Sequence, residues 1–222
     1  MGRKYELTAA DGATVPVFLY GPDHQAKAVF LMLPALGVKA RFYRHLAKGL
    51  AEQGIATVLF EQRGHGESEC WPQKGSSDGH DQYLKLDLPL AIDWVKQQLP
   101  GVPFFLGGHS LGAHLSNFIA VDRGAEITGL IHMACVFPYH GFYPRKQAIL
   151  LKVLCAAIPF LTRVLGYYPG ALFGFGGKEH GQLMMDWREW AQTGCYDYGQ
   201  VRGIEGHMAN YEGTLLSISF EG

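Results

Sequence analysis

The stretch Phe104–Ala120, FFLGGHSLGAHLSNFIA, places two structural patterns on either side of one serine. Apolar residues before Ser110 predict a buried strand, and apolar residues that recur after it predict a helix. Gly108 and Gly112 stand two residues before and after the serine, where a strand and a helix that meet at a sharp turn leave no room for side chains. The sequence therefore predicts a tight turn that exposes the Ser110 hydroxyl at the carboxyl edge of a sheet.

The segments around this turn alternate between strand and helix patterns. Short apolar runs predict strands buried on both faces, and apolar residues at helical spacing predict helices between them. The strand runs are Ala28–Leu33, Ile55–Phe60, the run that starts at Phe104 and ITGLIHMA (127–134), and the helical positions are Phe42, Leu46 and Leu50 and then Leu84 to Leu99. Strands and helices in this order form right-handed crossovers. The predicted fold class is α/β, a mostly parallel sheet with helices on both faces that opens with a hairpin.

The alternation stops after Val136. Residues 137–200 are rich in aromatic residues, glycine and proline, and the strand pattern returns only in TLLSISF (214–220). We therefore predict an α/β core at 1–136, a cap insertion at 137–200 over the carboxyl edge of the sheet, and a return to the core at 201–222.

One long amphipathic stretch lies inside the predicted insertion, KQAILLKVLCAAIPFLTRVLGYY (146–168). Lys152, Pro159 and Arg163 interrupt it, so its uncharged runs are much shorter than the roughly 20 residues that a membrane span requires. We expect a helix that lies over the sheet, and no membrane partner.

The composition excludes several other classes of protein. With 222 residues, 48% of them hydrophobic, and a formal charge of −1, the chain can bury a core and lacks the basic excess of a nucleic-acid-binding protein. The cysteines are widely spaced, without a C-x-x-C pair, so neither a disulfide framework nor a zinc site is indicated. No apolar signal segment is present near the N-terminus. We expect a cytoplasmic protein that needs no metal or cofactor and binds no nucleic acid.

Several segments resemble the α/β-hydrolase family of serine hydrolases, in the order in which that family has them. Residues 30–68, FLMLPALGVKARFYRHLAKGLAEQGIATVLFEQRGHGES, are similar to the family's oxyanion strand, first helix, next strand and glycine-rich loop. GHSLG (108–112) is similar to its G-x-S-x-G turn. DWREWAQ (186–192) resembles the cap of a branch known as predicted hydrolases or serine-aminopeptidase-like proteins.

This resemblance implies a reaction and three site residues. Ser110 would attack the carbonyl carbon of an ester, thioester or amide, and the backbone N–H groups of Leu36 and Leu111 would hold the oxyanion. The chain has Pro34–Gly37 where family members usually begin the oxyanion loop with His-Gly, but the donor is a backbone group, so this departure leaves the mechanism intact. The aromatic and aliphatic residues of the predicted cap favour a small-molecule substrate with an acyl or otherwise apolar group.

The other members of the catalytic triad are harder to assign. In this fold the acid and then the histidine follow the serine, and TLLSISF resembles the strand that precedes the acid, so the acid is expected at or past Gly222 and the histidine later. His207 precedes this strand and is the alternative base, in which case Asp186 or Asp197 would be the acid. The alternative function is a truncated or inert hydrolase-fold binding protein.

The remaining histidines and the tryptophans receive structural interpretations. His109 and His114 flank the serine and are expected to be structural, whereas a pocket role stays open for His65 and His80, which we expect on loops. Trp187 and Trp190 share a helical face and are expected to pack the cap onto the core. The apolar strand Leu215–Phe220 would form an exposed edge through which two chains could associate.

Overall fold

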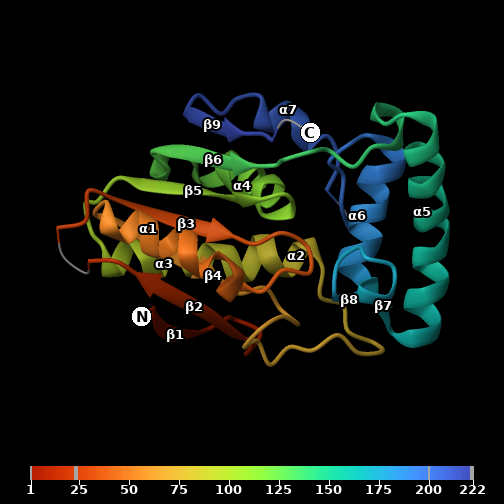
Figure 1. The fold of residues 1–222 in the computed structure, drawn as a ribbon, viewed down its shortest axis with the longest axis horizontal. Helices are drawn as coiled ribbons and strands as arrows, with labels where there is room; N and C mark the ends of the chain where they lie inside the picture. The colour runs from red at the N-terminus through yellow and green to blue at the C-terminus, as the bar shows by residue number, and fades with distance from the viewer. Residues whose placement is uncertain (1, 23–24, 200, 221–222) are drawn as a thin grey trace.

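The computed structural model describes residues 2–22, 25–199 and 201–220. Within these residues the central sheet has seven strands in the order β1-β2-β4-β3-β5-β6-β9 (Figure 1). The strands are β1 (Arg3–Thr8), β2 (Thr14–Tyr20), β3 (Ala28–Leu33), β4 (Ile55–Phe60), β5 (Phe104–His109), β6 (Gly129–Met133) and β9 (Thr214–Ile218). β2 pairs antiparallel with β1 and β4, and the other neighbours are parallel. The α/β class, the opening hairpin and the predicted strands are confirmed.

Helices follow most of these strands. The helices of the sheet region are α1 (Arg44–Glu52), α2 (His80–Gln82), the π-helical η2 (Tyr83–Asp87), α3 (Leu88–Gln98) and α4 (Leu111–Arg123). The later segment contains α5 (Arg145–Leu165), the small ladder of β7 (Tyr167–Pro169) and β8 (Lys178–His180), α6 (Gly181–Thr193) and α7 (Ile204–Met208). Short 3-10 turns are η1 (Ala40–Tyr43), η3 (Gly124–Glu126), η4 (His140–Phe142) and η5 (Gly170–Leu172).

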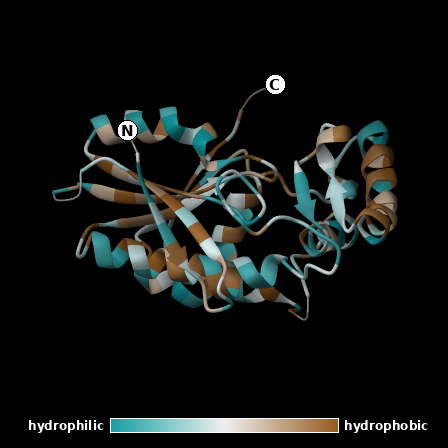
Figure 2. Cartoon of the chain, turned by 90° about the horizontal axis from the view of Figure 1, so that it is seen from below, coloured by the Kyte–Doolittle hydropathy of each residue, from teal (hydrophilic) through white to brown (hydrophobic). Residues whose placement is uncertain are grey.

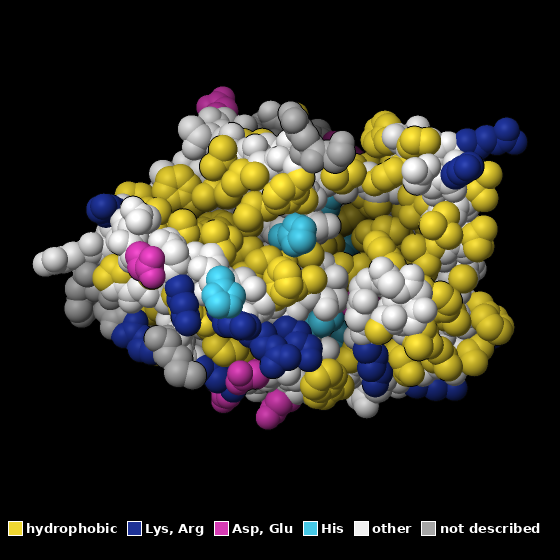
Figure 3. Space-filling model, viewed as in Figure 1, with side chains coloured by type: hydrophobic (Ala, Val, Ile, Leu, Met, Phe, Trp, Pro, Cys, Tyr) yellow, Lys and Arg dark blue, Asp and Glu magenta, His cyan; other side chains and the backbone are white. Residues whose placement is uncertain are grey.

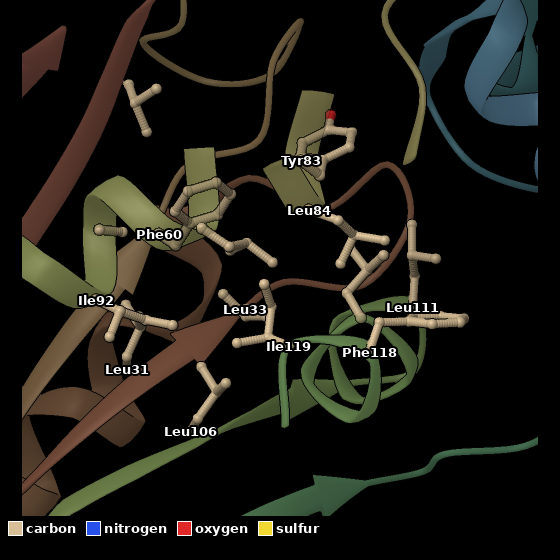
Figure 4. Packing of buried hydrophobic residues seen from close by; sticks show 14 of the residues in the cluster. Leu31, Leu33, Phe60, Tyr83, Leu84, Ile92, Leu106, Leu111, Phe118 and Ile119 are labelled. Carbon is tan, nitrogen blue, oxygen red and sulfur yellow. The ribbon is translucent and has the colours of Figure 1, made fainter. Parts of the chain in front are cut away.

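The two faces of the sheet bury alternate residues of each central strand. Val29, Leu31 and Leu33 of β3 pack in the larger core cluster with α3 and α4, whereas Phe30 and Met32 pack on the α1 side. Successive side chains of a strand point to opposite faces, so a continuous apolar run fits a strand that is covered on both sides. Figure 4 shows part of the larger cluster, and Figure 2 shows apolar residues concentrated along the strands between the helices.

The first helix buries a different face from the one that its apolar spacing indicates. Phe42 is 69% exposed and Leu46 is 40% exposed, whereas Tyr43 and Ala47 are buried against the sheet. A 3-10 turn, η1, precedes α1, and the buried residues Tyr43 and Ala47 each lie one position after a predicted one. The helix exists as predicted, but a four-residue spacing of large side chains did not identify its buried face.

The α5, α6, β7 and β8 elements lie together beyond one end of the sheet (Figure 1). α5 is the helix expected in this segment, and its 21 residues are continuous through Pro159. By length and composition alone it is apolar enough to cross a membrane, and 11% of its most apolar window is buried. Pro159 cannot donate to the Cys155 carbonyl one turn earlier, and Arg188 of α6 supplies the missing donor, with Nε 2.8 Å from that oxygen.

Strand β9 is the outermost strand of the described sheet, next to β6. All five of its residues are exposed, and Leu215 and Leu216 are 56% and 55% exposed. The register places Leu216 beside Ile131 and Ile218 beside Met133, so these four side chains share one face of the sheet. Ile131 and Met133 are half-buried, and Leu216 and Ile218 are exposed. The sheet therefore carries an apolar surface on its α1 side, next to that helix.

Candidate active site

Ser110 lies at the junction of β5 and α4, as predicted. Its backbone has a φ of 50° and a ψ of −112°, a conformation that a non-glycine residue adopts only under strain. Its N–H donates to the Met133 carbonyl at the end of β6, with a distance of 2.9 Å. The surrounding sheet therefore holds the serine in a conformation that it would not adopt in an isolated chain.

The two glycines of the turn are needed for close packing. A Cβ added at Gly108 would lie 2.1 Å from the Leu33 carbonyl oxygen, and one added at Gly112 would lie 2.3 Å from it. Both contacts are with backbone atoms of β3, which cannot move aside. The steric reason that the sequence suggested for the glycines is thus confirmed, with Leu33 as the residue that crowds them.

A cavity of about 640 Å³ begins at Ser110. Its walls come from the turn, from the loop after β6, from α5 and from the segment around Phe175 (Figure 3 shows the apolar side chains on this side of the molecule). The lining residues are mainly aliphatic or aromatic: Leu36, Leu111, Val136, Leu150, Leu151, Val153, Leu154, Leu161, Phe173, Phe175 and Trp187. Among the described residues that line it there is no carboxylate. The cavity therefore suits an apolar group that extends away from the serine.

Leu36 and Leu111 both line this cavity together with Ser110. Leu111 is the first residue of α4, so its N–H has no acceptor within the helix and can bind an anion. Leu36 lies in the loop after β3, whose flanking residues Pro34 and Ala35 are buried. The structure thus brings the predicted nucleophile and both predicted donors to one cavity; their roles stay a prediction.

Three side chains that sequence reasoning missed hold the loop that contains Leu36. Gln62 Nε2 donates to the Pro34 carbonyl, at 3.2 Å. Glu61 Oε1 accepts the Ala40 N–H, at 2.8 Å. Tyr43 Oη accepts the Ala35 N–H, at 3.0 Å. Glu61 and Gln62 follow β4 and lie far along the chain from Pro34, which follows β3. Sequence reasoning missed their contacts because the parallel strands bring these two loops together only in the folded chain.

Tyr43 also connects this loop to the nucleophile turn. Its hydroxyl is hydrogen-bonded to His109 Nδ1, at 3.0 Å, while its oxygen accepts the Ala35 N–H. His109 is adjacent to Ser110 and half-buried. Through Tyr43, His109 joins the turn to the loop that contains Leu36, which fits the structural role expected for it.

His114 lines the cavity, but both of its ring nitrogens have other partners. Nδ1 is 2.6 Å from Tyr196 Oη and Nε2 is 3.2 Å from the Val136 carbonyl. A carbonyl only accepts, so Nε2 carries the proton and Nδ1 accepts from the tyrosine. Burial lowers the pKa of His114 to about 4, which keeps the ring neutral. This arrangement fits the structural role expected for His114.

His207 and its two candidate acids are not joined by any contact that the described residues show. His207 is exposed on α7 and is not among the residues that line the cavity. The Asp186 carboxylate accepts the His80 N–H at 2.9 Å, and that of Asp197 accepts the Gly203 N–H at 2.8 Å. The assignment of His207 as base stays a prediction, and this geometry adds no support to it.

His80 lies in a helix rather than on a loop. It is the first residue of α2, is fully buried, and stacks on Trp190 with ring centroids 4.3 Å apart. Burial lowers its pKa to about 3. Trp190 also stacks on Phe118 of α4, at 5.4 Å, so it packs the later segment onto the core as predicted. Trp187 is buried in the same core cluster and also lines the cavity.

A strained serine between a parallel strand and a helix, in a sheet of this order, defines the class of serine hydrolases with the α/β-hydrolase fold. Two solved structures with this fold match over 100% of the chain: α/β hydrolase GrgF from Penicillium sp. sh18, with a TM-score of 0.64 and 16% identity over 91% of that chain, and a thermostable carboxyl esterase from Bacillus coagulans, with a TM-score of 0.59 and 17% identity over 90% of that chain.

Sequence comparison identifies the family. The family model described as serine aminopeptidase, S33, matches residues 24–185, and the chain belongs to this family. A monoglyceride lipase homolog of Monkeypox virus is 32% identical over 138 residues, which are 62% of this chain and 49% of that protein. Monoglyceride lipase of Mus musculus is 28% identical over 152 residues, which are 68% and 48%. The chain spans about half the length of these curated relatives.

Proposed function

We propose that this protein hydrolyses a carboxylic ester of an apolar acyl group. Ser110 Oγ attacks the carbonyl carbon, the bond to the alcohol oxygen breaks, and water then releases the acyl group from the serine. The observation that carries this proposal is the position of Ser110, which lies strained and half-buried at the wall of a mainly apolar cavity of about 640 Å³. The names of the curated relatives, monoglyceride lipases, support an ester substrate.

In this proposal two parts of the cavity bind two parts of the substrate: one binds the reacting carbonyl group and the other binds the apolar acyl chain. In this proposal the N–H groups of Leu36 and Leu111, two residues that line the cavity with Ser110, donate to the oxyanion and stabilise its charge. Leu151, Leu154 and Leu161 of α5 are among the residues that extend the apolar wall. In this proposal, residues 137–200 act as a cap that selects the acyl group.

A fluorophosphonate probe and p-nitrophenyl esters test the nucleophile. The protein should be labelled at Ser110 and should hydrolyse p-nitrophenyl butyrate, and Ser110→Ala should lose both by several orders of magnitude. Ser217→Ala is the matched control, since Ser217 is exposed on β9. Turnover that persists in Ser110→Ala would refute the assignment.

His207→Gln tests the base in the same assay, because loss of the base should slow labelling as well as turnover.

The absence of a carboxylate among the described cavity-lining residues, and the engaged nitrogens of His114, favour a second candidate. In this candidate the fold binds an apolar acyl compound without turning it over. Folded protein that binds a fatty acid but is not labelled at Ser110 would support the binding function and contradict the hydrolase.

A further inference from the structure

A buried ion pair connects the glycine-rich loop of the core with strand β8. His65 Nε2 is 3.3 Å from Glu179 Oε1, and both side chains are almost completely buried. His65 Nδ1 is 3.0 Å from the Arg63 carbonyl oxygen. Because both partners of the imidazole are acceptors, both hydrogen bonds form only when the ring carries two protons. The geometry therefore corresponds to an imidazolium paired with a carboxylate.

The Glu179 carboxylate also holds a turn of backbone. Its Oε1 accepts the N–H of Gly177, two residues earlier. A Cβ added at Gly177 would lie 3.2 Å from Glu179 Oε1 and 3.4 Å from His65 Nε2. The ion pair thus fixes the position of the Gly176–Gly177 backbone.

That backbone lies directly against the loop that contains Leu36. A Cβ added at Gly37, whose φ is +77°, would lie 2.4 Å from the Gly177 nitrogen and 2.5 Å from the Gly176 carbonyl carbon. The Leu36 side chain also approaches Gly176, since a Cβ added there would lie 3.4 Å from Leu36 Cδ2. The contact is between two backbones, so a shift of Gly176–Gly177 leaves the Gly37 side of the loop without support.

We propose that His65 and Glu179 are positioning residues for the oxyanion loop, acting through Gly177 and Gly37 on the N–H of Leu36. This inference rests on the proposed hydrolase function, in which Leu36 donates to the oxyanion. Gln62, Tyr43 and Glu61 hold the loop from the core side, and the His65–Glu179 pair completes its support from the β8 side. Neither residue lines the cavity beside Ser110, so neither contacts the substrate.

The pair makes this support dependent on pH. Burial alone would lower the pKa of His65, but the hydrogen bond and charge of Glu179 outweigh burial and raise it. The ion pair is therefore present below the raised pKa and is lost as the pH rises through it. Other titratable groups that act on the pair from the same loop and from the elements packed against it are Glu61, Tyr83, Tyr168 and His180.

Glu179→Gln tests the proposal, because it keeps the shape and the acceptor oxygen while it removes the charge. For p-nitrophenyl butyrate, kcat should fall about tenfold with KM nearly unchanged, which is less than the 10²–10³-fold cost of removing an oxyanion donor. The alkaline limb of the labelling rate should move to lower pH, since the pKa of His65 is no longer raised.

His65→Gln should lower kcat similarly, because its amide still donates to Glu179 but carries no charge. Glu189→Gln is the control, since Glu189 pairs with Arg202 at 3.4 Å on the surface.

Hydrogen exchange gives a readout that does not depend on activity. In Glu179→Gln the amides of residues 34–40 should exchange faster than in the parent protein at the same pH, and Glu189→Gln should leave them unchanged. Unaltered exchange and an unaltered kcat in a folded Glu179→Gln protein would overturn the positioning role. A parent protein that is neither labelled nor active, but shows the faster exchange in the variant, would refute the hydrolase function and keep the structural link.

Discussion

At the scale of the single residue, the backbone of Ser110 adopts a conformation that lowers the stability of the fold. A φ of 50° with a ψ of −112° is accessible to glycine and costly for other residues, by about 1–3 kcal/mol. The hydrogen bond from its N–H to Met133, and the contact of Gly108 and Gly112 with Leu33, impose this conformation on the serine. The strain therefore comes from residues that the sheet brings to the turn.

We predict that Ser110→Gly is more stable than Ser110→Ala by about 1 kcal/mol, because alanine retains the strain and glycine releases it. Urea unfolding of both variants measures the difference. The control pair is Ser217→Gly and Ser217→Ala, which should show the opposite order, since Ser217 lies in an extended strand where glycine is unfavourable. An equal stability of the two Ser110 variants would show that the turn is not strained.

At the scale of the element, α5 keeps its helix across Pro159 because another helix donates to it. The Cys155 carbonyl, which Pro159 leaves without a helical donor, accepts from Arg188 Nε at 2.8 Å. Since α5 lines the cavity, this hydrogen bond from α6 contributes to the shape of the site.

We predict that Arg188→Met lowers the free energy of unfolding by about 1–2 kcal/mol, because the Cys155 carbonyl loses its donor. In a Pro159→Ala background the same substitution should cost less, since the N–H of residue 159 then satisfies that carbonyl. The double-mutant cycle by chemical denaturation measures the difference. Equal losses in the two backgrounds would mean that Arg188 acts independently of the proline.

The second element with a testable property is β9. Its outer edge carries unpaired backbone groups within the described sheet, and Leu216 and Ile218 extend an apolar face that continues onto β6. We predict that the 222-residue chain self-associates through this edge and that Leu216→Lys with Ile218→Lys reduces the association. Sizing chromatography over a range of concentrations checks it. Leu172→Lys, at a residue 81% exposed outside the sheet, should not alter the profile.

At the scale of the whole molecule, Arg63 joins three separate parts of the chain. Its guanidinium, 3% exposed, bonds to Asp87 at the end of η2, to Asp78 in the preceding loop and to Asp11 in the β1–β2 turn. Arg63 lowers the pKa of Asp11. Burial would raise the pKa of Asp78, and hydrogen bonds from Ser76 and Arg63 outweigh it and lower the pKa.

We predict that the protein loses stability as the pH falls below about 4, the ordinary pKa of aspartate. A carboxylate with a lowered pKa stabilises the fold above its ordinary pKa, and that stability is lost as the pH falls through the lowered value. Thermal unfolding between neutral pH and pH 3 measures the decline, which should be shallower in Asp78→Asn. Glu52→Gln, at an exposed residue of α1, should retain the decline of the parent protein.

Local patterns in the sequence determined the strands, most of the helices and the turn at Ser110. A buried strand needs a continuous apolar run, and a strand–helix turn of this sharpness needs small residues at 108 and 112; both requirements are visible within a few residues. Leu36 and Leu111 could be predicted as donors because they occupy set positions relative to that turn and to β3.

Only the tertiary structure decided which residues support the site. Tyr43 meets His109, Glu179 meets His65 and Arg188 meets Cys155 across separations of 66, 114 and 33 residues. The burial of α1 on Tyr43 and Ala47, and of His80 against Trp190, was likewise missed. The physical reason is that side-chain contacts between separate elements depend on how the parallel strands align and how the helices pack across them. The spacing of residues within a short segment contains no information about either arrangement.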